Sequence, residues 1–379
     1  MKLNQSVYRD QAWTFLSETP GFSADHAQLV LAFGERFLLE KQNLYDDLRA
    51  RFPQADIVIN STSGEIYLDK VHDDSVIVTA IEFEKTRVRT VQIDINTHTE
   101  SFQAGQKIAE VLDAPDLATL FLISDGGKVN GSDLTRALNQ LLQRDIPISG
   151  GLAGDAARFE RTVVGLNQNP TPGKIVGIGF YGNDLKIGHG SMGGWDVFGP
   201  EREVTKSNYN VLYQIDDKHA LDLYKEYLGK YAQNLPAAAV LFPLSMRVTA
   251  ESEPLVRTIL AVDEEAKSMT FAGDMPEKAL IRFMTANFDR LIDASATAAQ
   301  TSMSQLNFTP ELAILISCVG RKLVLGQRTE EEVEAAREVF GNQAVMTGFY
   351  SYGEISPLLS NARCELHNQT MTVTVFSEN

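Results

Sequence analysis

The strongest constraint on the fold of this chain is a unit that occurs three times: an apolar strand, a helix, and a second strand that runs into a glycine followed by an acid. The three glycine–acid pairs are Gly64-Glu65, Gly154-Asp155 and Gly353-Glu354. A fourth pair, Gly273-Asp274, follows a strand-like segment but has no matching helix before it. The unequal intervals exclude a solenoid of fixed period. We interpret the four loops as an old duplication, with two loops in each half.

The segments around these loops alternate between strand and helix patterns. The apolar run 29–33 is too short for a buried helix, and Pro53 ends the helix that follows it. In the last unit, Thr329 and Glu332 have the spacing of a capping box at the start of a helix. Paired strand patterns, such as 174–181 followed by 185–190, predict hairpins between the units. The expected fold is therefore α/β, with mixed sheets built from strand–helix–strand units and hairpins, in two pseudo-repeated halves.

Charge and cysteine content exclude several classes of protein. The chain has 34 Lys and Arg residues against 50 Asp and Glu residues, a formal net charge of −16. Such a surface repels nucleic acids and anionic membranes, so we expect neither as a partner. Two cysteines cannot form a disulfide framework, and the N-terminus has no apolar secretion signal. The most apolar segment, 312–319, is too short to span a bilayer. We therefore expect a cytoplasmic protein.

The most unusual stretch is 186–200, which contains five glycines between residues 188 and 199. His189 has a glycine on each side, which lets a bulky group approach its imidazole closely. Trp195 and Phe198 offer flat apolar surface, and Met192 is an adaptable packing residue. Together these four side chains suit a planar apolar ligand. The alternative is a turn with a structural histidine and a core tryptophan.

Cys318 and Arg321 form a second point of interest. Cys318 ends an apolar strand, where a thiol could be an activated nucleophile or a small buried apolar residue. We predict that it is buried and takes no part in catalysis. Arg321 could bind a carboxylate through two parallel hydrogen bonds.

Several motifs resemble the FIST sensory domain. The segment 348–355, the run 367–370 and Ser317-Cys318-Val319-Gly320-Arg321 resemble its C-terminal half, and 61–65 with 150–155 resemble its N-terminal half. The resemblance divides the chain into halves 27–215 and 216–376. It implies a signal-input module that binds a small ligand and is not an enzyme. Because both halves are present, the chain is also similar to the nitric-oxide-sensing FIST proteins, which bind haem b and regulate a partner histidine kinase.

Three functional hypotheses follow. In the first, His189 is the proximal ligand of haem b, its other ring nitrogen is held by Asp155 or Asp196, and His367 is the next candidate. In the second, the chain senses an amino acid: Arg321 binds the carboxylate, and Glu65 or Glu354 binds the ammonium group. In the third, Cys318 with His189 or His367 forms a thiol hydrolase. We favour the first, with a histidine kinase as the signalling partner and homodimerisation as an option.

Overall fold

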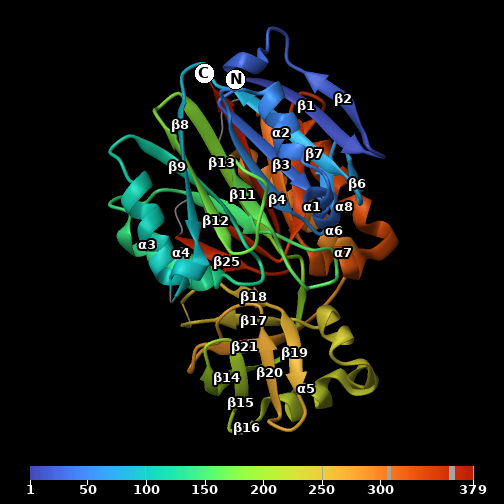
Figure 1. Ribbon diagram of the computed structural model, residues 1–379. Coiled ribbons are helices and arrows are strands. Elements are labelled where there is room, and N and C mark those ends of the chain that lie inside the picture. Colours follow the sequence, from blue (N-terminus) through green and yellow to red (C-terminus); the bar gives the residue numbers. More distant parts are fainter. Residues whose placement is uncertain (99, 250, 305–308, 358–362, 379) are drawn as a thin grey trace.

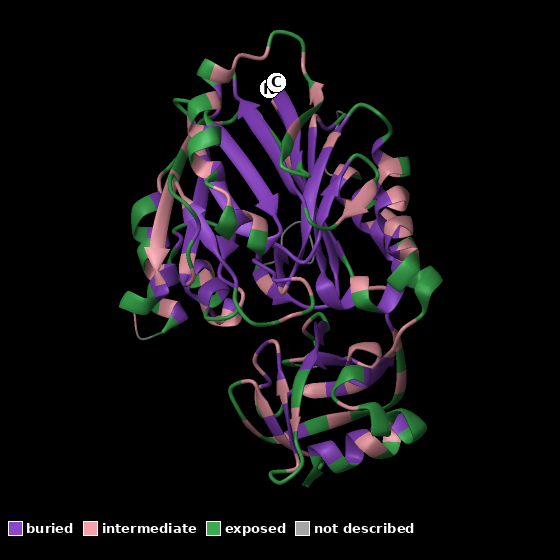
Figure 2. Ribbon diagram, turned by 45° about the vertical axis from the view of Figure 1, so that its right-hand side comes forward, coloured by how far each residue is buried: buried purple, intermediate pink, exposed green. Residues whose placement is uncertain are grey.

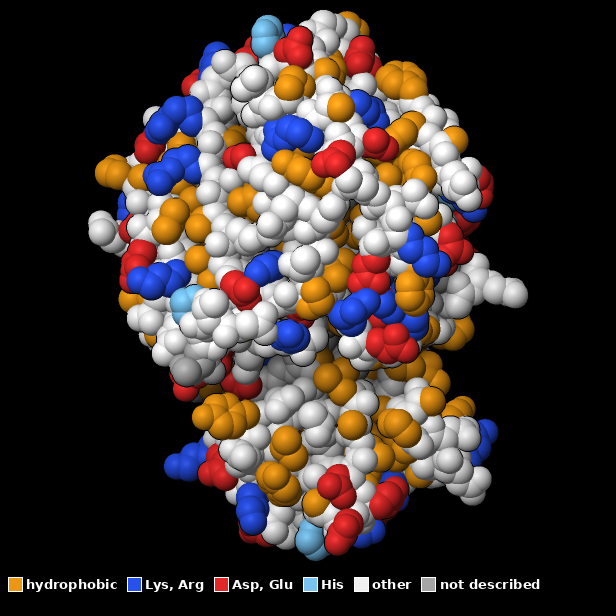
Figure 3. Space-filling model, in the orientation of Figure 1, with side chains coloured by type: hydrophobic (Ala, Val, Ile, Leu, Met, Phe, Trp, Pro, Cys, Tyr) orange, Lys and Arg blue, Asp and Glu red, His pale blue; other side chains and the backbone are white. Residues whose placement is uncertain are grey.

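The computed structural model describes residues 1–98, 100–249, 251–304, 309–357 and 363–378. A large body, in which three sheets surround an apolar core, is joined by a narrow waist to a smaller lobe (Figures 1 and 3). The two ends of the chain lie side by side on the body, at the end opposite the lobe (Figure 1). Among the described residues, no helix is both long and apolar enough to cross a bilayer.

Each sheet of the body has six strands. The first has the order β2 (Ala12–Glu18), β1 (Lys2–Arg9), β7 (Val76–Glu82), β3 (Leu29–Gly34), β4 (Asp56–Ser61), β11 (Val164–Leu166). The second has the order β8 (Arg87–Asp94), β12 (Lys174–Tyr181), β9 (Leu117–Ser124), β10 (Ile148–Leu152), β24 (Gly353–Pro357), β25 (Cys364–His367). The third has the order β13 (Leu185–Met192), β26 (Met371–Glu378), β22 (Leu312–Cys318), β23 (Val345–Ser351), β5 (Glu65–Tyr67), β6 (Lys70–His72).

The three sheets repeat one pairing pattern. A parallel pair lies at the centre of each sheet (β3 with β4, β9 with β10, β22 with β23), and an antiparallel strand (β7, β12, β26) pairs with its first member. The second member pairs with a strand from another unit: β5 follows β4 but pairs with β23, β24 follows β23 but pairs with β10, and β11 follows β10 but pairs with β4. Each unit thus lends a strand to the next, and the exchange closes into a ring. The α/β class with mixed sheets is confirmed, but the body repeats three times, and not as the two halves that the sequence predicted. The predicted hairpin of 174–181 with 185–190 is wrong, because β12 pairs with β8 and β9 in the second sheet while β13 pairs with β26 in the third.

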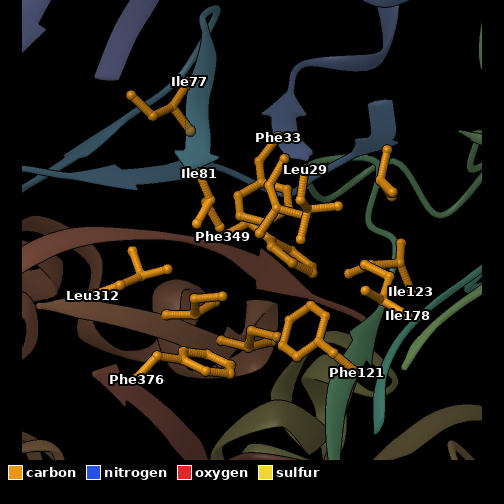
Figure 4. Packing of buried hydrophobic residues seen from close by; sticks show 14 of the residues in the cluster. Leu29, Phe33, Ile77, Ile81, Phe121, Ile123, Ile178, Leu312, Phe349 and Phe376 are labelled. Carbon is orange, nitrogen blue, oxygen red and sulfur yellow. The ribbon is translucent and has the colours of Figure 1, made fainter. Parts of the chain in front are cut away.

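Helices cover the outer faces of the sheets, and the inner faces form the central core. The helices are α1 (Arg36–Lys41) and α2 (Leu44–Arg51) on the first sheet, α3 (Ser101–Leu112) and α4 (Gly131–Leu141) on the second, and α6 (Phe288–Ser304) and α8 (Thr329–Phe340) on the third. Phe33, Phe121 and Phe349, one from each sheet, meet in the central core (Figure 4). Val30 and Ala32 of β3 face the helices instead. The run 29–33 is apolar throughout because β3 is buried on both faces, as are the purple strands of the body in Figure 2.

The lobe is an insertion between β13 and α6. Its elements are β14 (Asp196–Asn208), β15 (Val211–Ile215), β16 (Lys218–His219), α5 (Ala220–Leu228), η3 (Gly229–Asn234), η4 (Ala237–Leu241), β17 (Leu244–Arg247), β18 (Leu255–Arg257), β19 (Ile259–Asp263), β20 (Ser268–Phe271) and β21 (Leu280–Thr285). Its strands form one sheet over a separate apolar core, and its ends meet where Asp196 pairs with Thr285. Gly273-Asp274 lies in this lobe, so it is not part of a fourth body unit. The predicted boundary at 215/216 also falls inside the lobe, between β15 and β16.

A short helix, α7 (Val319–Leu325), lies at the waist. The remaining short elements are η1 (Ala24–His26), η2 (Ile95–Thr97) and η5 (Gly326–Arg328). Val324 and Leu325 of α7 form an apolar cluster with Trp195 and with Val256 of the lobe. Buried apolar contact therefore couples α7 to the lobe.

Candidate functional site

The glycine-rich stretch around His189 packs against a helix. A Cβ atom on Gly188 would lie 1.9 Å from the backbone oxygen of Ser302, and one on Gly190 would lie 1.9 Å from that of Ala298. Both oxygens belong to α6, so the two glycines let α6 lie directly on β13. The bulky neighbour that the sequence predicted for this strand is therefore a helix of the chain itself.

The four residues predicted to hold haem b do not form one site. Because side chains alternate along a strand, His189 faces away from α6, with its Nδ1 3.5 Å from the hydroxyl of Thr374. Trp195 belongs to the apolar cluster at the waist and donates from Nε1 to the oxygen of Gln369 at 2.8 Å. Phe198 packs in the lobe, and Met192 is exposed. Burial lowers the pKa of His189 to about 4, so the imidazole is neutral, as an iron ligand must be. The arrangement nevertheless does not fit haem b at His189.

The residues predicted to assist His189, and the one predicted to replace it as the iron ligand, are engaged elsewhere. Asp196 pairs with Arg290, and Asp155 pairs with Arg36 and Arg158. His367 is buried, and its Nε2 lies 2.8 Å from the backbone oxygen of Ser356. Burial lowers the pKa of His367 to about 4. These contacts give all three residues structural roles.

Arg321 is fully buried and already binds a carboxylate of the chain. Its guanidinium donates to Glu332 from Nε at 2.9 Å and from Nη2 at 2.7 Å, and to the backbone oxygens of Leu291 and Gly193 at 2.6 and 2.5 Å. Glu332 also accepts from Tyr350 at 2.7 Å. Arg321 therefore ties α7 to α6, to α8 and to the segment that leads into the lobe. The prediction that Glu332 forms a capping box is wrong, because its carboxylate points to Arg321 and no side chain caps the start of α8.

The three glycine–acid loops of the body meet in a ring. The N–H of Ser63 donates to Tyr350 at 2.8 Å, the N–H of Tyr352 donates to Leu152 at 3.2 Å, and the N–H of Gly154 donates to Ser61 at 2.9 Å. Each of these hydrogen bonds joins one loop to the next. The sequence pattern that repeats along the chain thus converges on one place in the fold.

The acids of these loops are buried and differ in their partners. Glu65 accepts hydrogen bonds from the hydroxyls of Thr62 at 2.5 Å and Ser75 at 2.7 Å, and Glu354 accepts from those of Ser351 at 2.6 Å and Thr370 at 2.9 Å. Burial raises the pKa of each glutamate to about 8. Burial would also raise the pKa of Asp155, but hydrogen bonds from Arg36 and Arg158 outweigh it and lower that pKa. Glu65 and Glu354 are therefore largely protonated at neutral pH, whereas Asp155 is ionised.

The raised pKa values predict a pH dependence of stability. An ordinary glutamate pKa is 4.5, so between about pH 4.5 and 8 the unfolded carboxyl releases its proton while the folded one keeps it. Each group then lowers the free energy of unfolding by up to ~1.4 kcal/mol per pH unit as the pH rises through this window. We expect Glu65→Gln and Glu354→Gln each to reduce the fall in the free energy of unfolding with rising pH, as measured by urea unfolding. The exposed Glu338→Gln should leave this slope unchanged. Equal slopes in all four proteins would contradict the assignment.

An open cleft of about 590 Å³ begins at the loop that carries Glu65. Its wall consists of the loop 62–65, Asp73 and Asp74, the loop 156–158, and side chains of α7 and the start of α8. Lys322 of α7 reaches into it and donates from Nζ to the backbone oxygen of Ser63 at 2.9 Å and to the carboxylate of Asp73. The cleft thus combines segments from all three units of the body with charged groups of both signs.

Sequence reasoning found Glu65 but missed Lys322 and Asp73. Lys322 directly follows Arg321, and Asp73-Asp74 lie in the turn between β6 and β7, so both were visible as charged residues near the ends of elements. Only the exchange of β5 between sheets brings them together, because the turn before β7 and the helix after β22 then face the same loop.

Cys318 is buried, as predicted. It is 4% exposed, and burial raises the pKa of its thiol far above the usual range. The thiolate that a nucleophile requires is therefore disfavoured. Its lack of a catalytic role stays a prediction.

Comparison with known proteins identifies the family. The FIST N domain model matches residues 28–218, and the FIST C domain model matches residues 220–357. The uncharacterized protein MJ1623 of Methanocaldococcus jannaschii is 26% identical over 216 residues, which are 52% of this chain and 40% of that protein. This chain thus spans about two-fifths of the length of that relative. A cyanuric acid hydrolase from A. caulinodans aligns over 94% of this chain and 92% of its own, with 9% identity and a TM-score of 0.39. The two family models together cover most of the chain, which therefore belongs to the FIST family of small-ligand-binding sensory domains for signal transduction.

Proposed function

We propose that this chain is a sensor of amino acids and that the cleft between the loop 62–65 and α7 is its ligand site. The observation that carries the proposal is the presence of a cation and carboxyl groups within one cleft of suitable size. An amino acid carries one charge of each sign, so it can satisfy both. The Nζ of Lys322 would bind its carboxylate, and Asp73 would bind its ammonium group. The carboxyl group of Glu65, which is largely protonated at neutral pH, would accept a hydrogen bond from the same ammonium group. The sequence assigned the ligand's carboxylate to Arg321, and Lys322 takes that role here. Glu65 keeps its assigned place at the ammonium group.

The same helix offers a path for the signal. Lys322 and Leu323 of α7 line the cleft, while Val324 and Leu325 pack in the cluster at the waist. Arg321 donates to the oxygen of Gly193, where the chain leaves the body for the lobe. A ligand that shifts Lys322 would therefore also shift contacts of the lobe. A histidine kinase that reads this change is part of the proposal.

Isothermal titration with free amino acids tests the ligand site. We expect saturable binding of at least one amino acid, and a loss of affinity of tenfold or more in Lys322→Met and Asp73→Asn, because each removes a charge that contacts the ligand. Lys107→Met, in an exposed pair on α3, is the matched control and should bind as the wild type does. Absence of binding by every amino acid would contradict the proposal.

An absorption titration with haem b separates this proposal from the haem hypothesis. We expect no saturable haem band in the wild type, because the residues around His189 do not form a haem site. A stoichiometric band that disappears in His189→Ala would instead establish haem binding and contradict the amino-acid assignment.

A further inference from the structure

The cleft proposed as the amino-acid site is lined by more acids than bases. Five carboxyl groups line it, those of Glu35, Glu65, Asp73, Asp74 and Glu330. Two cationic side chains, Arg158 and Lys322, face them. Even with Glu65 protonated, four carboxylates remain against two cations.

Both cations are already paired with acids of the same cleft. Arg158 donates to Glu35 at 2.7 Å, and Lys322 contacts Asp73. Two carboxylates are therefore left without a partner inside the cleft. Glu330 pairs with Lys70 at 3.2 Å, but both side chains are more than two-fifths exposed, and such surface pairs are weak. Among the described residues, Asp74 makes no hydrogen bond or ion pair.

A second observation is that the wall of the cleft already holds an ammonium group. The Nζ of Lys322 lies 2.9 Å from the backbone oxygen of Ser63, contacts Asp73, and lies 5.5 Å from the centre of the Tyr350 ring. A carbonyl oxygen, a carboxylate and an aromatic face are the groups that bind alkylammonium ions. Besides one of the acids already counted, the wall thus offers a cation a carbonyl oxygen and an aromatic face.

We infer that the ligand carries a net positive charge, and that the site selects basic α-amino acids over neutral and acidic ones. This inference rests on the proposed function and adds the class of amino acid. The zwitterionic end of the ligand binds at Lys322, Asp73 and Glu65. The side-chain cation of the ligand binds between Asp74 and Glu330, whose charges no residue inside the cleft neutralises. An acidic ligand would add a third uncompensated negative charge and is rejected.

Titrations with L-lysine and L-norleucine test this inference, because the two differ only in the terminal ammonium group. We expect L-lysine to bind at least tenfold more tightly than L-norleucine at low salt, and L-glutamate to bind more weakly than either. The double variant Asp74→Asn with Glu330→Gln should lower the affinity for L-lysine to that for L-norleucine and leave L-norleucine unchanged. Glu334 is the other carboxylate paired with Lys70, and Glu334 does not line the cleft. Glu334→Gln should therefore change the affinity for neither amino acid.

The outcomes separate the two claims. Equal affinities for L-lysine and L-norleucine, or tighter binding of L-glutamate, would overturn the inference and leave the amino-acid site standing. An L-lysine affinity that the double variant leaves unchanged would overturn the assignment of Asp74 and Glu330. Absence of binding by every amino acid would overturn the proposed function itself. Circular dichroism checks that the variants, which change exposed or half-buried residues, stay folded.

Discussion

Residues 1–195, expressed alone, are expected not to reach a native structure. This fragment holds β5, β6 and β13 but lacks β22, β23 and β26, the strands with which they pair or share the third sheet. It also lacks Leu312, Phe349 and Phe376, which close the central core (Figure 4). The inner faces of the two remaining sheets would then be exposed to water, which promotes aggregation. Size-exclusion chromatography and near-ultraviolet circular dichroism measure the outcome.

Removal of the lobe is the matched control. Because Asp196 and Thr285 are paired neighbours, a short glycine-rich linker can replace 196–286 without stretching the body. We expect this variant to be folded, although less stable because Trp195 loses its apolar cover. We attribute the cooperative folding of the body to the ring of exchanged strands. A folded fragment 1–195, or an unfolded variant without the lobe, would contradict this. Co-expression of 1–195 with 287–379 should restore a complex.

Arg321→Met is expected to destabilise the protein by ~3–5 kcal/mol, because it leaves the buried carboxylate of Glu332 without its guanidinium. Both side chains of this pair are fully buried, and the same guanidinium binds the backbone of Leu291 and Gly193. Urea unfolding followed by circular dichroism gives the change in the free energy of unfolding.

Two further variants distinguish this buried pair from ordinary packing. Arg321→Met combined with Glu332→Leu should recover part of the loss, because no unpaired charge then remains in the core. Arg321→Lys should not recover it, because one ammonium group cannot reproduce two parallel hydrogen bonds. A loss below ~1 kcal/mol in Arg321→Met would show that the pair contributes little to stability.

The candidate site illustrates what a single sequence can reveal about function. Glu65 was recognisable because a glycine–acid pair after a strand is a local pattern, and the cleft does contain it. Arg321 was equally visible, but whether an arginine faces a ligand or an internal carboxylate depends on a residue that lies elsewhere in the chain. His189 had the right neighbours in sequence for a planar ligand. Those neighbours point to different parts of the molecule, because side chains alternate along β13 and the chain then leaves the body.

The class of fold and many of its elements follow from local properties of the chain. Apolar periodicity and turn chemistry act over a few residues. They set the strand 29–33, the helix that ends before Gly341, and the glycine–acid loops. The number of repeated units, the insertion of the lobe and the composition of the cleft are set by pairing between distant strands. The strand β5 is only three residues long and pairs with β23, which lies far along the chain, so this choice of neighbour depends on the packing of all three sheets around one core. That choice places Lys322 beside Ser63, so tertiary structure alone decides which charges share the cleft.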